Sequence, residues 1–135
     1  MPLTERLFTI DENTEFGVYY YYNPLWVRSI IFLPGFNDYF CNMELVELLQ
    51  KASVNVFAIL PRHYGKLKRP DGVGRFYIAN IDAYFREIDE TIEFIDRLID
   101  PHCNSLYMCG FSTGGLTAIS YCTAATTAAA YAVSY

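Results

Sequence analysis

The stretch "MCGFSTGG", residues 108–115, places Ser112 among three glycines, Gly110, Gly114 and Gly115. An uncharged apolar run at 105–112, typical of a buried strand, leads straight into the serine, and small residues suited to a helix begin at Thr113. A serine at a tight strand-to-helix turn needs small neighbours, because the turn strains its backbone and leaves no room for side chains. We therefore predict such a turn at Ser112, with its hydroxyl above the sheet and the first helical amides aimed at a developing negative charge. A glycine-rich helix start that merely packs closely is the alternative.

Strand and helix patterns alternate along the rest of the chain. Three apolar runs lack hydrophobic alternation, as strands buried on both faces do: 27–35, 54–62 and 105–112. Helical spacing of apolar residues predicts helices over 38–53 and over 80–100, the second with Asn80 as N-cap. The first 22 residues look like two strands around a turn at Asp11–Asn13.

This alternation predicts an α/β domain over 1–122, with a mostly parallel sheet and helices on both faces. A tail at 123–135, rich in Ala and Thr, has no clear structural pattern. The tail lacks Leu, Ile and Phe, so we expect no membrane span there.

Charge and composition exclude several classes of function. Apolar residues make up 53% of the 135 residues and charged residues 19%, which is a folding composition. The net charge of −5 argues against binding to nucleic acid. Seven acids against two arginines give segment 81–100 the same −5, so we interpret the charge as one solvated helix face.

The cysteines match neither a zinc spacing nor a small disulfide scaffold: Cys41, Cys103, Cys109 and Cys122. We therefore expect no metal and no cofactor. The N-terminus has no basic segment followed by an apolar run, so we expect no signal peptide, reduced thiols and a cytoplasmic location. Cys109 lies inside a predicted strand and is expected to be a core thiol.

Three motifs give the chain a resemblance to the α/β-hydrolase superfamily, in the branch of monoglyceride lipases, lysophospholipases and serine aminopeptidases. They are "LPGFNDYF" at 33–40, "LPRHYGKLKRP" at 60–70 and "GFSTGGL" at 110–116, and the resemblance covers about 25–122. It implies that Ser112 is a nucleophile and that the backbone amides of Phe36 and Thr113 form an oxyanion hole. It also implies a carboxylic ester or acylglycerol substrate, and a loop from His63 to Arg69 that shapes the entrance.

The sequence departs from the family pattern at four positions near these motifs. Pro34 replaces a histidine in the loop that carries the oxyanion donor, which leaves the bracing of that loop unexplained. Phe111 replaces the histidine before the serine, Pro61 stands where an acid is frequent, and Leu67 stands where a serine is frequent.

The acid and the base of a catalytic triad have no match in this chain. The family places both after the serine, but no charged residue and no histidine follows Ser112. His102 is expected in a surface loop at the start of the serine's strand, whereas His63 is an unusual candidate base. The resemblance therefore implies that the chain has the N-terminal part of the fold and that later strands are missing. It also implies a serine hydrolase that is incomplete, and therefore inactive, as this chain.

Two alternatives stay open, a non-catalytic pseudohydrolase or interaction module and a truncated gene product. With later strands missing, we expect the strand at 105–110 to present an unpaired apolar edge and to promote self-association. A basic cluster in the loop after the second buried strand could bind an anion, but we favour solvated side chains: Arg62, Lys66, Lys68, Arg69 and Arg75.

Overall fold

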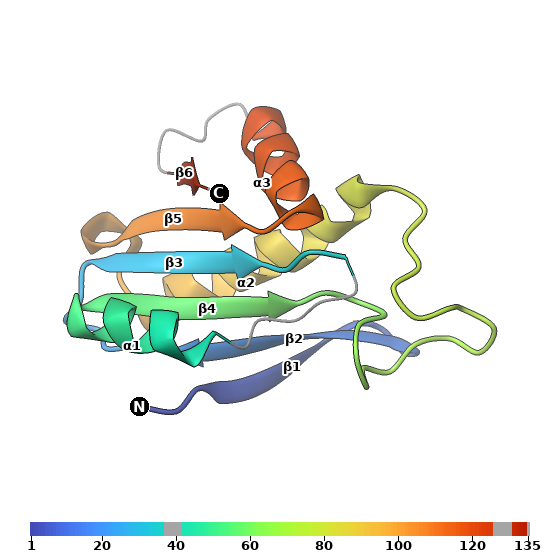
Figure 1. Ribbon diagram of the computed structural model, residues 1–135, viewed down its shortest axis with the longest axis horizontal. Coiled ribbons are helices and arrows are strands. Elements are labelled where there is room, and N and C mark those ends of the chain that lie inside the picture. Colours follow the sequence, from blue (N-terminus) through green and yellow to red (C-terminus); the bar gives the residue numbers. More distant parts are fainter. Residues whose placement is uncertain (37–41, 126–130, 135) are drawn as a thin grey trace.

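The structure, a computed structural model, describes residues 1–36, 42–125 and 131–134 (Figure 1). The described strands form one sheet in the order β1-β2-β4-β3-β5-β6. Their bounds are β1 (Thr4–Asp11), β2 (Thr14–Tyr21), β3 (Arg28–Leu33), β4 (Val54–Leu60), β5 (Ser105–Gly110) and β6 (Tyr131–Ser134). Three of the five strand pairings are parallel, those of β3 with β4, β3 with β5 and β5 with β6. The prediction of a mostly parallel sheet is confirmed.

The two antiparallel pairings come from the N-terminal hairpin. β1 pairs with β2 around a turn in which the Asp11 carboxylate accepts a hydrogen bond of 2.8 Å from the amide of Asn13. β2 then pairs antiparallel with β4. The predicted pair of strands around Asp11–Asn13 is therefore confirmed.

Helices cover both faces of the sheet, as the uninterrupted apolar strands predict. In Figure 1, α1 (Met43–Lys51) lies in front of the sheet and α2 (Phe85–Leu98) behind it. α3 (Thr113–Ala124) contributes to the same core as α2, while α1 packs on a separate, smaller core. No helix in the described parts of the chain is both long and apolar enough to cross a bilayer.

The first helix is shorter than its predicted range of 38–53. It begins after Asn42, whose side chain accepts a hydrogen bond of 3.0 Å from the amide of Leu45 and so caps the helix. It ends at Lys51, because Ser53 adopts a left-handed φ of 59°. Residues 38–41 lie outside the described residues.

The second predicted helix is confirmed, with one correction to its charged face. It starts as the 3₁₀ turn η1 (Ile81–Tyr84), capped by the Asn80 side chain, and continues as α2. The expectation of a solvated acidic face is wrong for Glu87, which is buried and pairs with Arg62. In the sequence Glu87 could not be distinguished from the other acids of this helix, although it lies on the helix face that packs against the core.

The expected unpaired edge at 105–110 is also wrong. β6 runs parallel beside β5 (Figure 1), in a register that places Leu106 opposite Tyr131 and Cys109 opposite Ser134. The tail at 123–135 thus contributes the last residues of α3 and a strand of the sheet. Because β6 pairs with this edge of β5, the edge is not open for the self-association that we expected from the sequence.

Candidate functional site

The tight turn predicted at Ser112 is present between β5 and α3. Ser112 has φ 55° and ψ −119°, a conformation that L-residues with a side chain rarely adopt, and it is exposed to solvent. Its side chain does not cap α3. Ser112 is thus a strained residue whose hydroxyl does not cap the helix, at the carboxyl end of an inner parallel strand, where ligands of α/β sheets bind.

Two glycines make this turn sterically possible. A Cβ atom on Gly110 would overlap the carbonyl of Gly114 and the amide of Gly115. A Cβ atom on Gly114 would overlap the carbonyl oxygens of Leu33 and Pro34. Glycine is therefore required at both positions by the close approach of three backbone segments.

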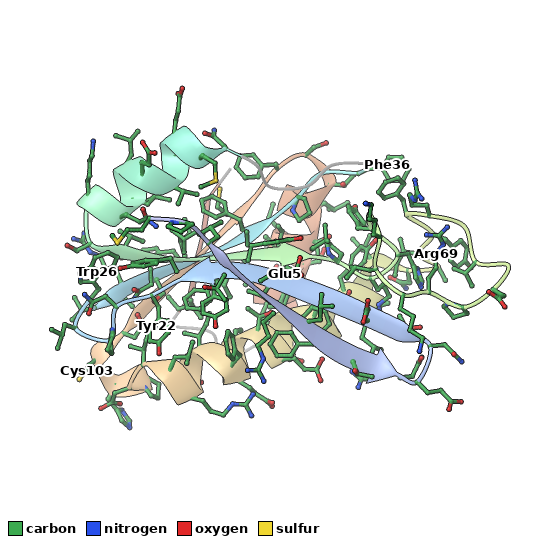
Figure 2. The ribbon with its side chains drawn as sticks, turned by 90° about the horizontal axis from the view of Figure 1, so that it is seen from below. Glu5, Tyr22, Trp26, Phe36, Arg69 and Cys103 are labelled. Atoms are coloured by element: carbon green, nitrogen blue, oxygen red, sulfur yellow. The ribbon has the colours of Figure 1, made fainter. Side chains whose placement is uncertain are left out.

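The loop after β3 lies directly against the Ser112 turn. The amide of Phe111 donates a hydrogen bond of 3.0 Å to the carbonyl of Leu33. A Cβ atom on Gly35 would lie 3.3 Å from the Ser112 Cβ atom. Figure 2 shows Phe36 at the same end of the molecule as Arg69, opposite Cys103, which precedes β5.

A cavity of about 100 Å³ is lined by both residues that carry the candidate amides. Pro34 and Gly114 line it together with Phe36 and Thr113. Among the described residues, neither of these two amides donates to a backbone carbonyl. The volume corresponds to about three water molecules, room for a small polar group and its immediate neighbours.

Two buried tyrosines, Tyr64 and Tyr84, also line this cavity. The Tyr64 hydroxyl donates a hydrogen bond of 3.1 Å to the carbonyl oxygen of Gly35. Burial raises the pKa of Tyr84 well above its usual range, and the neighbouring hydroxyl of Tyr64 adds to this rise. Neither tyrosine was selected from the sequence as a site residue, although Tyr64 lies inside the motif at 60–70.

From the sequence we expected Arg62 to be a solvated side chain of the basic cluster. That expectation is wrong for Arg62. Its guanidinium forms an ion pair with Glu87, with Nη2 2.6 Å from Oε1, and donates a second bond of 2.8 Å to the carbonyl of Ala83. The amide of Arg62 also donates to Glu87, at 3.2 Å. The turn that carries Tyr64 is therefore fixed to the start of α2.

The two histidines lie apart from this cavity. His63 is buried with φ 67°, and its Nδ1 atom is 2.6 Å from the carbonyl oxygen of Tyr77. His102 is exposed in the short helix η2 (Pro101–Cys103), at the opposite end of β5 from Ser112, as expected for a surface loop. Within the described parts of the chain, no histidine or carboxylate lines the cavity.

A larger groove, of about 850 Å³, lies between the N-terminal hairpin and the loop after β4. Four leucines are among the residues that line it: Leu3, Leu7, Leu60 and Leu67. On its wall, a hydrogen bond with Glu5 raises the pKa of Tyr19 to about 12. Phe36 and Thr113 line the smaller cavity and not this groove, whereas Ser112, the neighbour of Thr113, lines neither, so the smaller cavity is the candidate site. Across the described residues, no three potential metal ligands cluster.

Known structures share this fold at low sequence identity. A putative hydrolase from Agrobacterium vitis S4 superposes with a TM-score of 0.74 at 14% identity, over 99% of this chain and 51% of that chain. The α/β hydrolase GrgF from Penicillium sp. sh18 gives 0.72 at 14% identity, over 90% and 41%. The esterase Pf2001 from Pyrococcus furiosus gives 0.65 at 20% identity, over 87% and 45%.

No protein-family model matches the sequence, and no curated protein matches it. Other structural neighbours include a thioesterase domain and an epoxide hydrolase, so the fold alone does not identify the reaction. The chain spans about half of the length of the structures that it matches, or somewhat less. The chain has the N-terminal part of an α/β-hydrolase fold.

Proposed function

We propose that this chain carries the nucleophile and the oxyanion hole of a serine hydrolase that acts on carboxylic esters, including acylglycerols. The observation that supports this most strongly is the exposed Ser112 at φ 55°, beside a cavity lined by Phe36 and Thr113. A strained serine at this point of the sheet presents its hydroxyl to a ligand rather than to the protein.

In the proposed reaction, Ser112 Oγ attacks the carbonyl carbon of the ester and forms a new carbon–oxygen bond. The carbonyl electron pair moves to oxygen, and the amides of Phe36 and Thr113 donate hydrogen bonds to that negative charge. Thr113 is the first residue of α3, so the helix dipole adds to this stabilisation. The alcohol then leaves with a proton, and water hydrolyses the acyl-serine.

This reaction needs a base that accepts the Ser112 proton, and no histidine or carboxylate lines the cavity in the described residues. Loss of the imidazole base lowers the rate of a serine hydrolase by about 10⁴- to 10⁶-fold. We therefore expect negligible turnover by the 135-residue chain alone. The same observation favours the second candidate, a non-catalytic pseudohydrolase that uses the cavity for interaction only.

We place this chemistry in the cytoplasm, because the cysteines described by the structure are free thiols: Cys103, Cys109 and Cys122. No cofactor takes part in the proposed reaction.

Adding the missing base from solution distinguishes the two candidates. Hydrolysis of p-nitrophenyl butyrate is measured with increasing imidazole for the wild type, Ser112→Ala and Ser120→Ala, a control on the same helix. The hydrolase proposal predicts a protein-dependent rate that rises with imidazole in the wild type and Ser120→Ala but not in Ser112→Ala. Equal rates in all three proteins would support the pseudohydrolase.

A further inference from the structure

We propose that Tyr64 is a positioning residue that orients the backbone amide of Phe36 toward the oxyanion. This inference rests on the proposed function, because the proposed function is what makes the Phe36 amide an oxyanion donor. The carbonyl of Gly35 and the N–H of Phe36 belong to one planar peptide group, in which the two bonds point in opposite directions. A hydrogen bond that fixes the Gly35 carbonyl therefore also fixes the direction of the Phe36 N–H.

Tyr64 supplies that hydrogen bond from the loop after β4. Its hydroxyl donates to the Gly35 oxygen at 3.1 Å, and both residues are buried. Water cannot readily replace a buried donor, so removing the hydroxyl leaves the Gly35 carbonyl unsatisfied. The peptide group would then be free to rotate toward another partner.

The Tyr64 hydroxyl is itself held by Tyr84. A hydrogen bond joins the two phenols, and a carbonyl oxygen can only accept. The single proton of Tyr64 therefore goes to Gly35, and Tyr84 donates to the Tyr64 oxygen. This relay connects the start of α2 to the loop after β3 through two hydroxyl groups.

The backbone of Tyr64 is also constrained. Its amide donates to the carbonyl of Pro61 at 3.2 Å, and its ring packs edge-on against Phe76 at 4.9 Å between ring centroids. The ion pair between Arg62 and Glu87 fixes the same turn to α2. The phenol thus reaches Gly35 from a support that does not depend on the loop after β3.

This arrangement explains how the chain tolerates Pro34. Proline has no backbone N–H and no side-chain donor, so Pro34 cannot donate a hydrogen bond that would brace its own loop. Tyr64 provides the bracing from the loop after β4 instead. Tyr64, 30 residues later in the sequence, therefore compensates for the proline that replaces the family's histidine at position 34.

The test measures the orientation of the Phe36 N–H directly, by its residual dipolar coupling in weakly aligned, ¹⁵N-labelled protein. Tyr64→Phe removes only the hydroxyl and keeps the ring that packs on Phe76. Tyr107→Phe, an exposed tyrosine on β5, is the matched control. We expect the Phe36 coupling to change in Tyr64→Phe and to keep its wild-type value in Tyr107→Phe.

A kinetic measurement accompanies the coupling. Loss of a complete oxyanion donor lowers kcat by about 10²- to 10³-fold. A misdirected donor should cost less, so we expect imidazole-supported kcat to fall about 10- to 100-fold in Tyr64→Phe, with KM within about twofold. A general loss of folding would instead lower the fraction of active protein and change the whole NMR spectrum.

The outcomes separate the two proposals. An unchanged Phe36 coupling in folded Tyr64→Phe overturns the positioning role, whatever the activity. A changed coupling, in a protein whose wild type shows no imidazole-supported hydrolysis, supports the positioning role and contradicts the hydrolase proposal. If Tyr64→Phe does not fold, Tyr84→Phe removes the outer hydroxyl of the relay, and an unchanged Phe36 coupling there overturns the inference.

Discussion

Nη2 of Arg62 lies 2.6 Å from Oε1 of Glu87, although only 1% of the Glu87 side chain is exposed. This ion pair joins the turn after β4 to α2, and so holds Tyr64 in place beside the candidate oxyanion loop. A buried ion pair stabilises little in net terms, but the buried Glu87 carboxylate would be strongly unfavourable without Arg62, whose own side chain is 17% exposed.

We predict that Arg62→Leu lowers the free energy of unfolding by about 3–5 kcal/mol, because it leaves the Glu87 carboxylate buried without a partner. Urea unfolding followed by circular dichroism measures the change. Arg86→Gln is the control, because the Arg86 side chain is 52% exposed and lies as far as 3.9 Å from Glu90 on the same helix. It should cost no more than about 0.5 kcal/mol. Similar losses in the two variants would show that the Arg62 pair is not buried.

Gly110 and Gly114 give a second prediction, on the packing of the turn. Gly110→Ala and Gly114→Ala should each destabilise by at least about 2 kcal/mol, because the new methyl group meets backbone atoms that cannot move aside. Gly74→Ala is the matched control, since its Cβ atom would have open space around it. Thermal unfolding compares the three proteins. Equal melting temperatures for Gly110→Ala and Gly74→Ala would contradict the close approach of β5 and α3.

The backbone of Ser112 gives a third prediction. At φ 55° a residue with a Cβ atom is strained, and glycine is not. Ser112→Gly should therefore be more stable than Ser112→Ala, by about 1 kcal/mol. The comparison removes the hydroxyl from both proteins and isolates the backbone term. If Ser112→Ala is as stable as Ser112→Gly, Ser112 does not have this conformation in solution.

A fourth prediction concerns the edge of the sheet. β6 pairs with Leu106–Cys109, so a chain that ends at Ala125 exposes the apolar edge of β5. We expect this shortened chain to self-associate more strongly than the full 135 residues, which should elute as a monomer of 15.5 kDa. Size-exclusion chromatography with light scattering measures both. A monomeric shortened chain at the same concentration would mean that β6 does not protect β5.

Local patterns in the sequence were sufficient to predict the fold near Ser112. The strand before Ser112 lacks charge, and Gly110 and Gly114 mark the turn. Farther from Ser112, Asn80 caps η1, which continues as α2, as expected. These features act between residues close in sequence, where spacing and residue size are directly visible.

The contacts that support the site could not be predicted in this way. Arg62 and Glu87 are 25 residues apart, and Tyr64 and Gly35 are 29 apart. Arg62 lies in a basic loop and Glu87 in an acidic helix, so both resemble solvated charges until the fold brings them together. β6 was missed because a run of small residues shows neither helical nor strand periodicity.

The most direct measurement is mass spectrometry of the chain after treatment with a fluorophosphonate probe, with and without imidazole. We predict no adduct without imidazole. With imidazole we predict an adduct located on Ser112, absent in Ser112→Ala and retained in Ser120→Ala. An adduct on Ser112 without imidazole would reveal a base within the chain, and His63→Gln would test whether His63 supplies it. An adduct elsewhere, or none at any imidazole concentration, would contradict the assignment of Ser112 as the nucleophile.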